Sequence, residues 1–596
     1  MRILRIAIYM VAAAALASAS CSLFGDDPDD AFNVVRVSLD ETTSAYSVAS
    51  ADEVVLTLDL ASPKDVYFVF TNASLTGSAA EPTVSSSVSV STSLASESRV
   101  SFESSPAAFV AAEASGVAAA NEEIRQSFAG SKISSSSRYL TGSADFTIDE
   151  TNLGIVGTST MDFNDYSNTA SGVVPVTLRY SSGAVATNQG ERALQVWVAN
   201  DCWEVDGNKD FLVTQAMVDA YAAKFLSSAG ADDDIFDWVT GILGAEWGDT
   251  SSPYLIDFDG IVNIVLFDIG DDELSSTSGS YWLGYFYGRD NVKTYTYSNK
   301  MLCFAIDAVL LALPGETKAS PESGTWSLAD SYWPNEMVST LAHEFQHMIS
   351  FYQNLNDTAD DTWAEEMMAM SIEDIVADKI LADGPRGVTY DDYSAGDSGT
   401  TVGRLPLFDY YPDLSLVDWS LGPQDLPSDD RTLAGYSSAY SFGAYLMRQY
   451  GGTAILQAIE DQGSVDASGV LAAVRSVSGD SSLSFVQLLG TWGAAVLLSD
   501  DSSQAAPYRY NAGSGGVLPE FTSTASGGSY NLGDINLFNY SYGAAAGPWI
   551  NESAPTAYGG LYPGSNAYYL AAEGLSGERT WTLDLPDGVY LTVVMK

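Results

Sequence analysis

The chain has 596 residues, of which 46% are hydrophobic and 17% charged, so it is long enough for several domains with substantial cores. Lys and Arg number 25 against 77 Asp and Glu, which gives a formal net charge of −52. Because phosphate and anionic-lipid contacts need clustered basic side chains, this balance argues against nucleic acid as a partner and against electrostatic docking on a membrane. The composition gives no indication of an oligomeric state.

The first 20 residues resemble a bacterial lipoprotein signal. Arg2 and Arg5 precede a short apolar run, and small residues lead up to Cys21. The resemblance implies cleavage before Cys21 and acylation of its thiol, which would anchor the protein to a bacterial membrane, at the cell surface or on the periplasmic side. An ordinary secretory signal cut nearby is the alternative, and both readings place the mature chain outside the cytoplasm. Residues 21–31 follow as an acidic tether.

Residues 32–190 are predicted to form a β-sandwich-like N-terminal domain. Runs of β-branched and aromatic residues between turn residues are typical of strands. The stretch 83–106 is Ser-rich and low in complexity, which predicts a loop that interrupts these strands. No catalytic spacing occurs here, so a spacer, a binding module or a pro-segment all fit this domain.

Residues 191–510 are predicted to form a domain with a mixed sheet and a helical lobe, followed by a small β-rich domain at 511–596. The overall fold class is therefore multidomain α+β. Cys202 and Cys303 could form a disulfide or remain as two buried free thiols. The segment Asp257-x-Asp259-Gly260 looks like part of a Ca²⁺-binding loop, but a plain turn fits it as well.

A short motif, His343-Glu344-Phe345-Gln346-His347, lies on a helix predicted to run from about Asn335 to Gln353. The chain contains 2 His, and both belong to this motif. Residues four apart on a helix share a face, so both imidazoles can bind one metal ion. Glu344 lies next to them and can take a proton from a metal-bound water.

A catalytic zinc site needs a third protein ligand. The next predicted helix, at about 362–380, is apolar near its start, where Glu365 and Glu366 are unexpected. A buried carboxylate must be paired with a charge or bound to a metal. Eighteen residues separate His347 from Glu366.

The pattern H-E-x-x-H-x18-E, with Trp363-Ala364-Glu365-Glu366 around its last residue, resembles the gluzincin metallopeptidases. The segment HEFQHMI resembles most the hyicolysin family of bacterial zinc peptidases. The resemblance covers roughly residues 190–500. It implies a thermolysin-like catalytic domain with one Zn²⁺ ion held by the three residues His343, His347 and Glu366, and with Glu344 as general base.

Two alternatives and one departure accompany this resemblance. Glu365 is the alternative third ligand, and Glu373 and Asp374 are weaker candidates because they are expected to be more exposed. Some gluzincins carry an Asp four residues after the ligand Glu, where it orients a His, but Met370 occupies that position here. In zinc peptidases a strand just before the metal helix commonly binds the substrate backbone, and the apolar run at 300–313 is the candidate.

The segment Tyr440-Ser441-Phe442-Gly443-Ala444 resembles the Y-x-K-G-A segment of aminopeptidase N-like gluzincins, whose Tyr donates a hydrogen bond to the oxyanion. Phe442 replaces the Lys, and Tyr436 is the alternative donor. The G-x-M-E-N segment that holds a free substrate amine in that group is absent from the sequence. This absence favours cleavage inside protein or peptide chains.

Together these features predict an extracytoplasmic, membrane-anchored zinc endopeptidase, in which a metal-activated water hydrolyses peptide bonds with Glu344 as general base. The alternative is a non-catalytic surface lipoprotein, of binding or structural type, that retains a metallopeptidase fold.

Overall fold

The computed structural model covers most of the chain after residue 33. It describes residues 34–48, 52–78, 83–86, 109–110, 115–128, 146–227, 233–248, 252–271, 281–355, 360–392, 399–422, 426, 428–511, 520–522, 528–543, 545–551 and 561–596. The predicted signal, the tether, Cys21 and residues 87–106 of the Ser-rich stretch lie outside these ranges. Within them, no helix combines the length and hydrophobicity that crossing a membrane requires.

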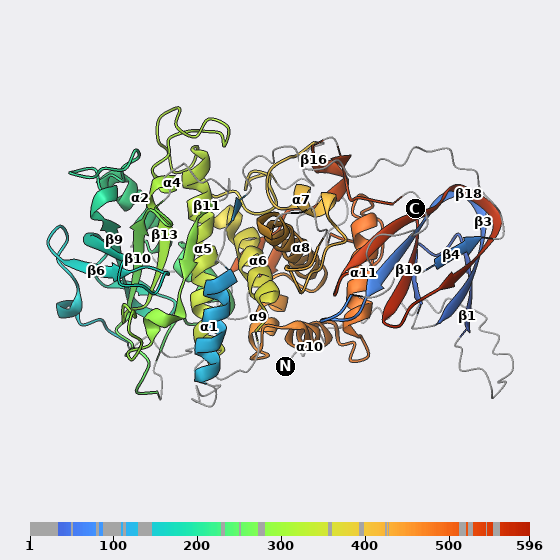
Figure 1. The fold of residues 1–596 in the computed structure, drawn as a ribbon, viewed down its shortest axis with the longest axis horizontal. Helices are drawn as coiled ribbons and strands as arrows, with labels where there is room; N and C mark the ends of the chain where they lie inside the picture. The colour runs from blue at the N-terminus through green and yellow to red at the C-terminus, as the bar shows by residue number, and fades with distance from the viewer. Residues whose placement is uncertain are drawn as a thin grey trace, which may run out of the picture.

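A seven-stranded mixed sheet forms one end of the molecule (Figure 1). Its strand order is β12-β13-β10-β9-β7-β6, and β8 pairs with β9. The strands β9, β10 and β13 are parallel and almost entirely buried, as apolar strands covered on both faces are expected to be. The strands are β6 (Thr160–Asn164), β7 (Val173–Ser181), β8 (Val185–Thr187), β9 (Gly190–Ala199), β10 (Ile261–Phe267), β12 (Gly284–Phe286) and β13 (Cys303–Asp307).

Helices occupy the middle of the molecule, next to this sheet (Figure 1). The helix α5 packs against β12 and β13 on one side and against α6 on the other. Nearly all of its residues are buried, because apolar side chains surround it. The helices α2 (Gln215–Phe225) and α4 (Ala308–Leu311) lie against the sheet itself. The other helices are α3 (Ile235–Leu243), α5 (Tyr332–Gln353), α6 (Thr362–Ile380), α7 (Leu405–Tyr410), α8 (Ser428–Gln449), α9 (Thr453–Glu460), α10 (Ala467–Ser478) and α11 (Phe485–Leu497). The predicted combination of a mixed sheet with many helices is confirmed.

A second large sheet joins the two ends of the described chain. Its order is β2-β19-β3-β18-β4, and β1 pairs with β3. The long strands β3 and β18 run antiparallel, from Glu53 opposite Asp584 to Thr71 opposite Asn566. The strands are β1 (Val34–Asp40), β2 (Ala45–Val48), β3 (Glu53–Asn72), β4 (Thr83–Ser86), β18 (Asn566–Asp584) and β19 (Val589–Met595).

This pairing corrects the predicted division into separate terminal β domains. The strands predicted at 32–190 are divided between two sheets, since β1 to β4 share a sheet with β18 and β19 whereas β6 to β8 join the sheet beside α5. The first four residues of the predicted loop at 83–106 form β4. The apolar pattern of a strand shows that it needs partners but does not identify them, and here the partners lie about 500 residues away in sequence.

Smaller elements complete the described fold. The helix α1 (Ser115–Ser127) lies against α6 and against the turn after β12. A short parallel pair joins β5 (Phe109–Val110) to β11 (Tyr281–Trp282). Two antiparallel pairs near the C-terminal end consist of β14 (Glu520–Thr522) with β15 (Ser529–Asn531), and β16 (Ser541–Tyr542) with β17 (Ala545–Ala546).

The remaining sequence expectations in this region concern cysteines and calcium. Cys202 and Cys303 are both buried free thiols, so they do not form a disulfide. Asp257 pairs with Lys293, and Asp259 accepts the backbone N–H of Ile261 at 3.0 Å within a turn. These contacts suit the turn interpretation, and Ca²⁺ binding stays a prediction.

Candidate metal centre

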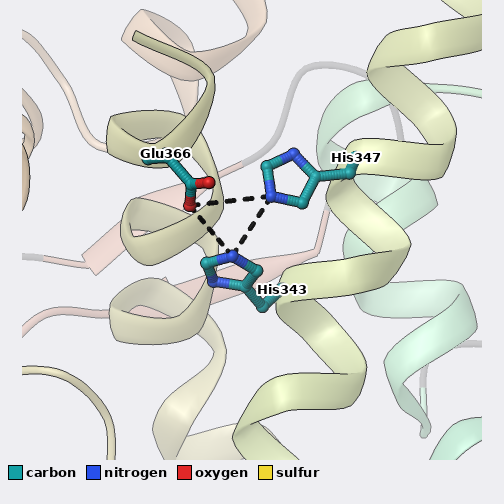
Figure 2. Close-up of side chains that lie close together, drawn as sticks. All are labelled: His343, His347 and Glu366. Atoms are coloured by element: carbon teal, nitrogen blue, oxygen red, sulfur yellow. Dashed lines mark hydrogen bonds and ion pairs between the residues drawn. The ribbon is translucent and has the colours of Figure 1, made fainter. Parts of the chain in front are cut away.

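Two imidazoles come together on one face of α5. His343 and His347 are separated by one helical turn, and their Nε2 atoms lie 3.1 Å apart (Figure 2). Both side chains are buried. Two imidazole nitrogens that face each other inside a protein need a partner between them, and a metal ion supplies one.

The neighbouring helix α6 brings a carboxylate to the same point. Glu366 Oε2 lies 3.1 Å from His343 Nε2 and 3.7 Å from His347 Nε2 (Figure 2). A tetrahedral zinc ion with ligands at about 2.0–2.2 Å requires ligand atoms separated by about 3.3 Å. These three atoms therefore fit one zinc ion with a fourth position left for another ligand.

Three buried carboxylate oxygens at this point have no hydrogen-bond partner among the described residues. Among the described residues, neither carboxylate oxygen of Glu344 has a hydrogen-bond partner, and Glu366 Oε2 has none either, although all are buried. Burial raises the pKa of Glu344 to about 7, against the opposing effect of the two imidazoles. Buried oxygens without partners are costly, so this donor set fits a bound cation.

A second carboxylate contacts His343 at Nδ1, the ring nitrogen that faces away from His347 and Glu366. Glu373 Oε1 lies 2.7 Å from His343 Nδ1, and Ser339 Oγ donates to Glu373 Oε2 at 2.6 Å. A carboxylate on Nδ1 leaves Nε2 available for a metal. Burial alone would lower the pKa of His343, but Glu366 and Glu373 together raise it to about 9.

Sequence reasoning left this orienting group unidentified and wrongly expected Glu373 and Asp374 to be the more exposed acids of α6, although both are buried. The signal that identifies Glu373 is its position seven residues after Glu366. Two helical turns place both carboxylates on the same side of α6.

Glu365, the alternative third ligand, lies on the other side of the His347 ring. Its Oε2 is 3.9 Å from His347 Nδ1, and its Oε1 accepts hydrogen bonds from Ser350 Oγ at 3.0 Å and from Arg125 Nη1 at 3.3 Å. Glu365 thus approaches the outer nitrogen of the ring, whereas Glu366 faces both Nε2 atoms.

The two candidate tyrosines have different partners. The Tyr436 hydroxyl donates to Glu366 Oε1 at 3.0 Å, whereas the Tyr440 hydroxyl donates to Asp374 Oδ2 at 3.0 Å. The oxyanion-donor role of Tyr440 or Tyr436 stays a prediction, and Tyr436, the alternative, is the one of the two whose hydroxyl contacts Glu366. The two residues are one turn apart on α8, and sequence alone did not show which face packs on Glu366.

The strand beside the site is also different from the predicted one. Residues 303–307 form β13, which lies inside the sheet between β10 and β12. The edge strand is β12, and it passes close to α5: a Cβ atom added at Gly284 would lie 3.1 Å from Glu344 Cγ. The backbone edge nearest to the candidate site thus belongs to β12.

Comparison with known proteins agrees with this geometry. A neutral metalloprotease, ShpI, from Staphylococcus hyicus is 34% identical over 166 residues, which cover 25% of this chain and 34% of that protein. The match thus spans about a third of the length of this relative. The sequence model of the peptidase M30 family matches residues 179–526, which include α5, α6 and α8. The predicted resemblance to hyicolysin-like metallopeptidases is confirmed, and the chain belongs to the peptidase M30 family.

Proposed function

We propose that this protein is an extracytoplasmic zinc-dependent endopeptidase. The observation that carries the proposal is the triangle formed by the Nε2 atoms of His343 and His347 and the Oε2 atom of Glu366, with the buried carboxylate of Glu344 beside it. This donor set, two His and one Glu, is the one that catalytic zinc sites of peptidases use. The similarity to a neutral metalloprotease supports the same reaction class.

Each residue of the site has its own role in metal binding or proton transfer. His343, His347 and Glu366 would hold the zinc ion, while Glu373 and Tyr436 fix the orientation of His343 and Glu366. A bound zinc ion supplies Lewis-acid activation of water and of a peptide carbonyl. Glu344 is the general base that accepts a proton on a carboxylate oxygen and returns it to the leaving amine.

The substrate and the location follow from the sequence features. The strand β12 is the edge of its sheet and lies beside Glu344, which suits the addition of an extended peptide. Cleavage within chains is favoured because the segment that would hold a free amine is absent from the sequence. Acylation of Cys21 would keep the enzyme on the membrane, and finding Cys21→Ser still in the membrane fraction would refute this anchor.

The experiment compares three purified proteins: the parent chain, Glu344→Gln, and Glu316→Gln as a control at an exposed position. We expect all three to carry one zinc ion, measured by mass spectrometry of the metal. Glu344→Gln should hydrolyse an unstructured protein about 10²–10⁴ times more slowly, because it lacks the general base. Equal hydrolysis by the parent and Glu344→Gln would favour the non-catalytic surface lipoprotein instead.

A further inference from the structure

The candidate catalytic residues are closed off from solvent. His343 and Glu344 are 0% exposed, and Glu366 is 1% exposed. His347 and Glu366 border a cavity of about 40 Å³, which has room for a few water molecules and none for a peptide. A substrate can therefore reach these residues only if one wall of the cavity moves.

Four elements build the walls of this cavity. The strand β12 contributes Phe286, and α5 contributes His347 and Phe351. The helix α6, together with Asp360 two residues before its start, contributes the acidic side. The fourth wall is α1, through Asn121, Glu122 and Arg125. The helix α1 is also the one of these four that lies outside residues 179–526, the region shared with the family.

The side chain of Asn121 occupies the edge of β12. Its Nδ2 donates to the carbonyl oxygen of Phe286 at 3.0 Å, and its Oδ1 accepts from the backbone N–H of Gly288 at 2.7 Å. A peptide lying along this edge would use the same carbonyl and the same N–H, because an added strand pairs through alternate residues. The amide of Asn121 thus takes the place of a substrate peptide group.

Arg125 fastens α1 to the other side of the cavity. Its guanidinium pairs with Asp360, and its Nη1 lies 3.3 Å from Glu365 Oε1, next to the ligand Glu366. Ile124 of the same helix and Phe128, the residue directly after it, are buried in the main core. These contacts hold α1 across the gap between β12 and α6.

We propose that α1 is a built-in inhibitor that occupies the substrate position on β12. This inference rests on the proposed endopeptidase function. In the structure the helix blocks the backbone groups of Phe286 and Gly288 and closes the cavity beside His347. A peptide binds after α1 has left the edge of β12, so the resting chain has low activity toward proteins.

Substitutions of Asn121 in the full chain test the proposal. Asn121→Asp keeps the size of the side chain and loses the donor to Phe286, and Asn121→Leu loses both hydrogen bonds. The control is Glu123→Gln, on an exposed position of α1. We expect casein hydrolysis by both Asn121 variants to rise about tenfold or more, because a larger fraction of molecules is open, and to be unchanged in the control. Melting curves establish that each variant is folded.

A second measurement does not depend on hydrolysis. In zinc-loaded Glu344→Gln, a peptide hydroxamate that ligates zinc should bind about tenfold more tightly once Asn121 is replaced, because it no longer competes with α1. Equal hydroxamate affinity together with equal or slower casein hydrolysis would overturn the proposal and make α1 a permanent wall of the site. Tighter hydroxamate binding by the Asn121 variants, without casein hydrolysis by those variants when Glu344 is intact, would support the inhibitor and refute the endopeptidase.

Discussion

Two buried polar clusters lie on the same helix, α6, and they differ in how completely their hydrogen bonds are made. In the first, Glu366 faces His343 and His347. In the second, Asp374 accepts hydrogen bonds at 3.0 Å from Tyr440 and from Arg448. Arg448 Nε and Nη2 both donate to the carbonyl oxygen of Gly533, at 3.0 and 2.6 Å, so the second cluster is internally complete.

The first cluster is incomplete without a cation. Both oxygens of Glu344 and one oxygen of Glu366 are buried and lack hydrogen-bond partners among the described residues. Leaving buried polar atoms unpaired costs about 1–3 kcal/mol each, so a sequence keeps them where a ligand completes the set. The Asp374 cluster stabilises the fold, whereas the cluster around Glu366 is arranged to bind a cation.

The largest expected effect that separates the two clusters comes from the metal. Removing zinc with a chelator should abolish hydrolysis and lower the free energy of unfolding by about 4 kcal/mol at a zinc concentration about 1,000 times the Kd, because zinc binds the folded state. Thermal melting with and without zinc measures this change. A melting temperature that does not respond to zinc would show that the cluster around Glu366 binds no metal.

Disrupting the Asp374 cluster should lower stability without removing the metal. Asp374→Asn leaves Arg448 buried without its charged partner, and we expect it to lower the free energy of unfolding by about 3–5 kcal/mol. Zinc content should stay at one ion per chain. Denaturant unfolding in the presence of zinc measures the stability, and loss of zinc from a folded Asp374→Asn protein would mean that the clusters are coupled.

The parts of the site that lie close together in sequence could be predicted, whereas distant partners could not. The spacing of His343 and His347 on one helix fixes their common face, and the family spacing identifies Glu366. Met370 indicated that the usual orienting Asp is missing, and Glu373, on the same face of α6, replaces it. Arg125, which contacts Glu365 across 240 residues of chain, had no local signal.

The same distinction applies to the fold. Helices such as α5 and α6 show their length and buried face in local periodicity, so their positions agree with prediction to within a few residues. The pairing of β3 with β18 depends on contacts such as Leu58 opposite Arg579, and neither strand encodes its partner. Long-range strand pairing was therefore the part of the architecture that the sequence did not reveal.

A smaller effect is expected for the group that orients His343. Glu373→Gln keeps the shape of the side chain but removes the negative charge that faces His343 Nδ1. We expect zinc affinity to fall about 10–100-fold. Competition with a zinc-binding dye measures the affinity. Asp374→Asn, a change of the adjacent residue, is the matched control, and equal losses of affinity in both variants would contradict an orienting role for Glu373.

The smallest expected effect compares two tyrosines one turn apart on α8. Each hydroxyl donates to one carboxylate at 3.0 Å, Tyr436 to Glu366 and Tyr440 to Asp374. Tyr436→Phe should lower zinc affinity about tenfold, because Glu366 loses the hydrogen bond that fixes its second oxygen. Tyr440→Phe should leave zinc affinity unchanged and lower the free energy of unfolding by about 1–2 kcal/mol. Each substitution deletes one tyrosine hydroxyl from α8, so a difference in zinc affinity between the two variants shows which cluster binds the metal. A larger loss of zinc affinity in Tyr440→Phe would make Tyr440 the tyrosine of the metal site.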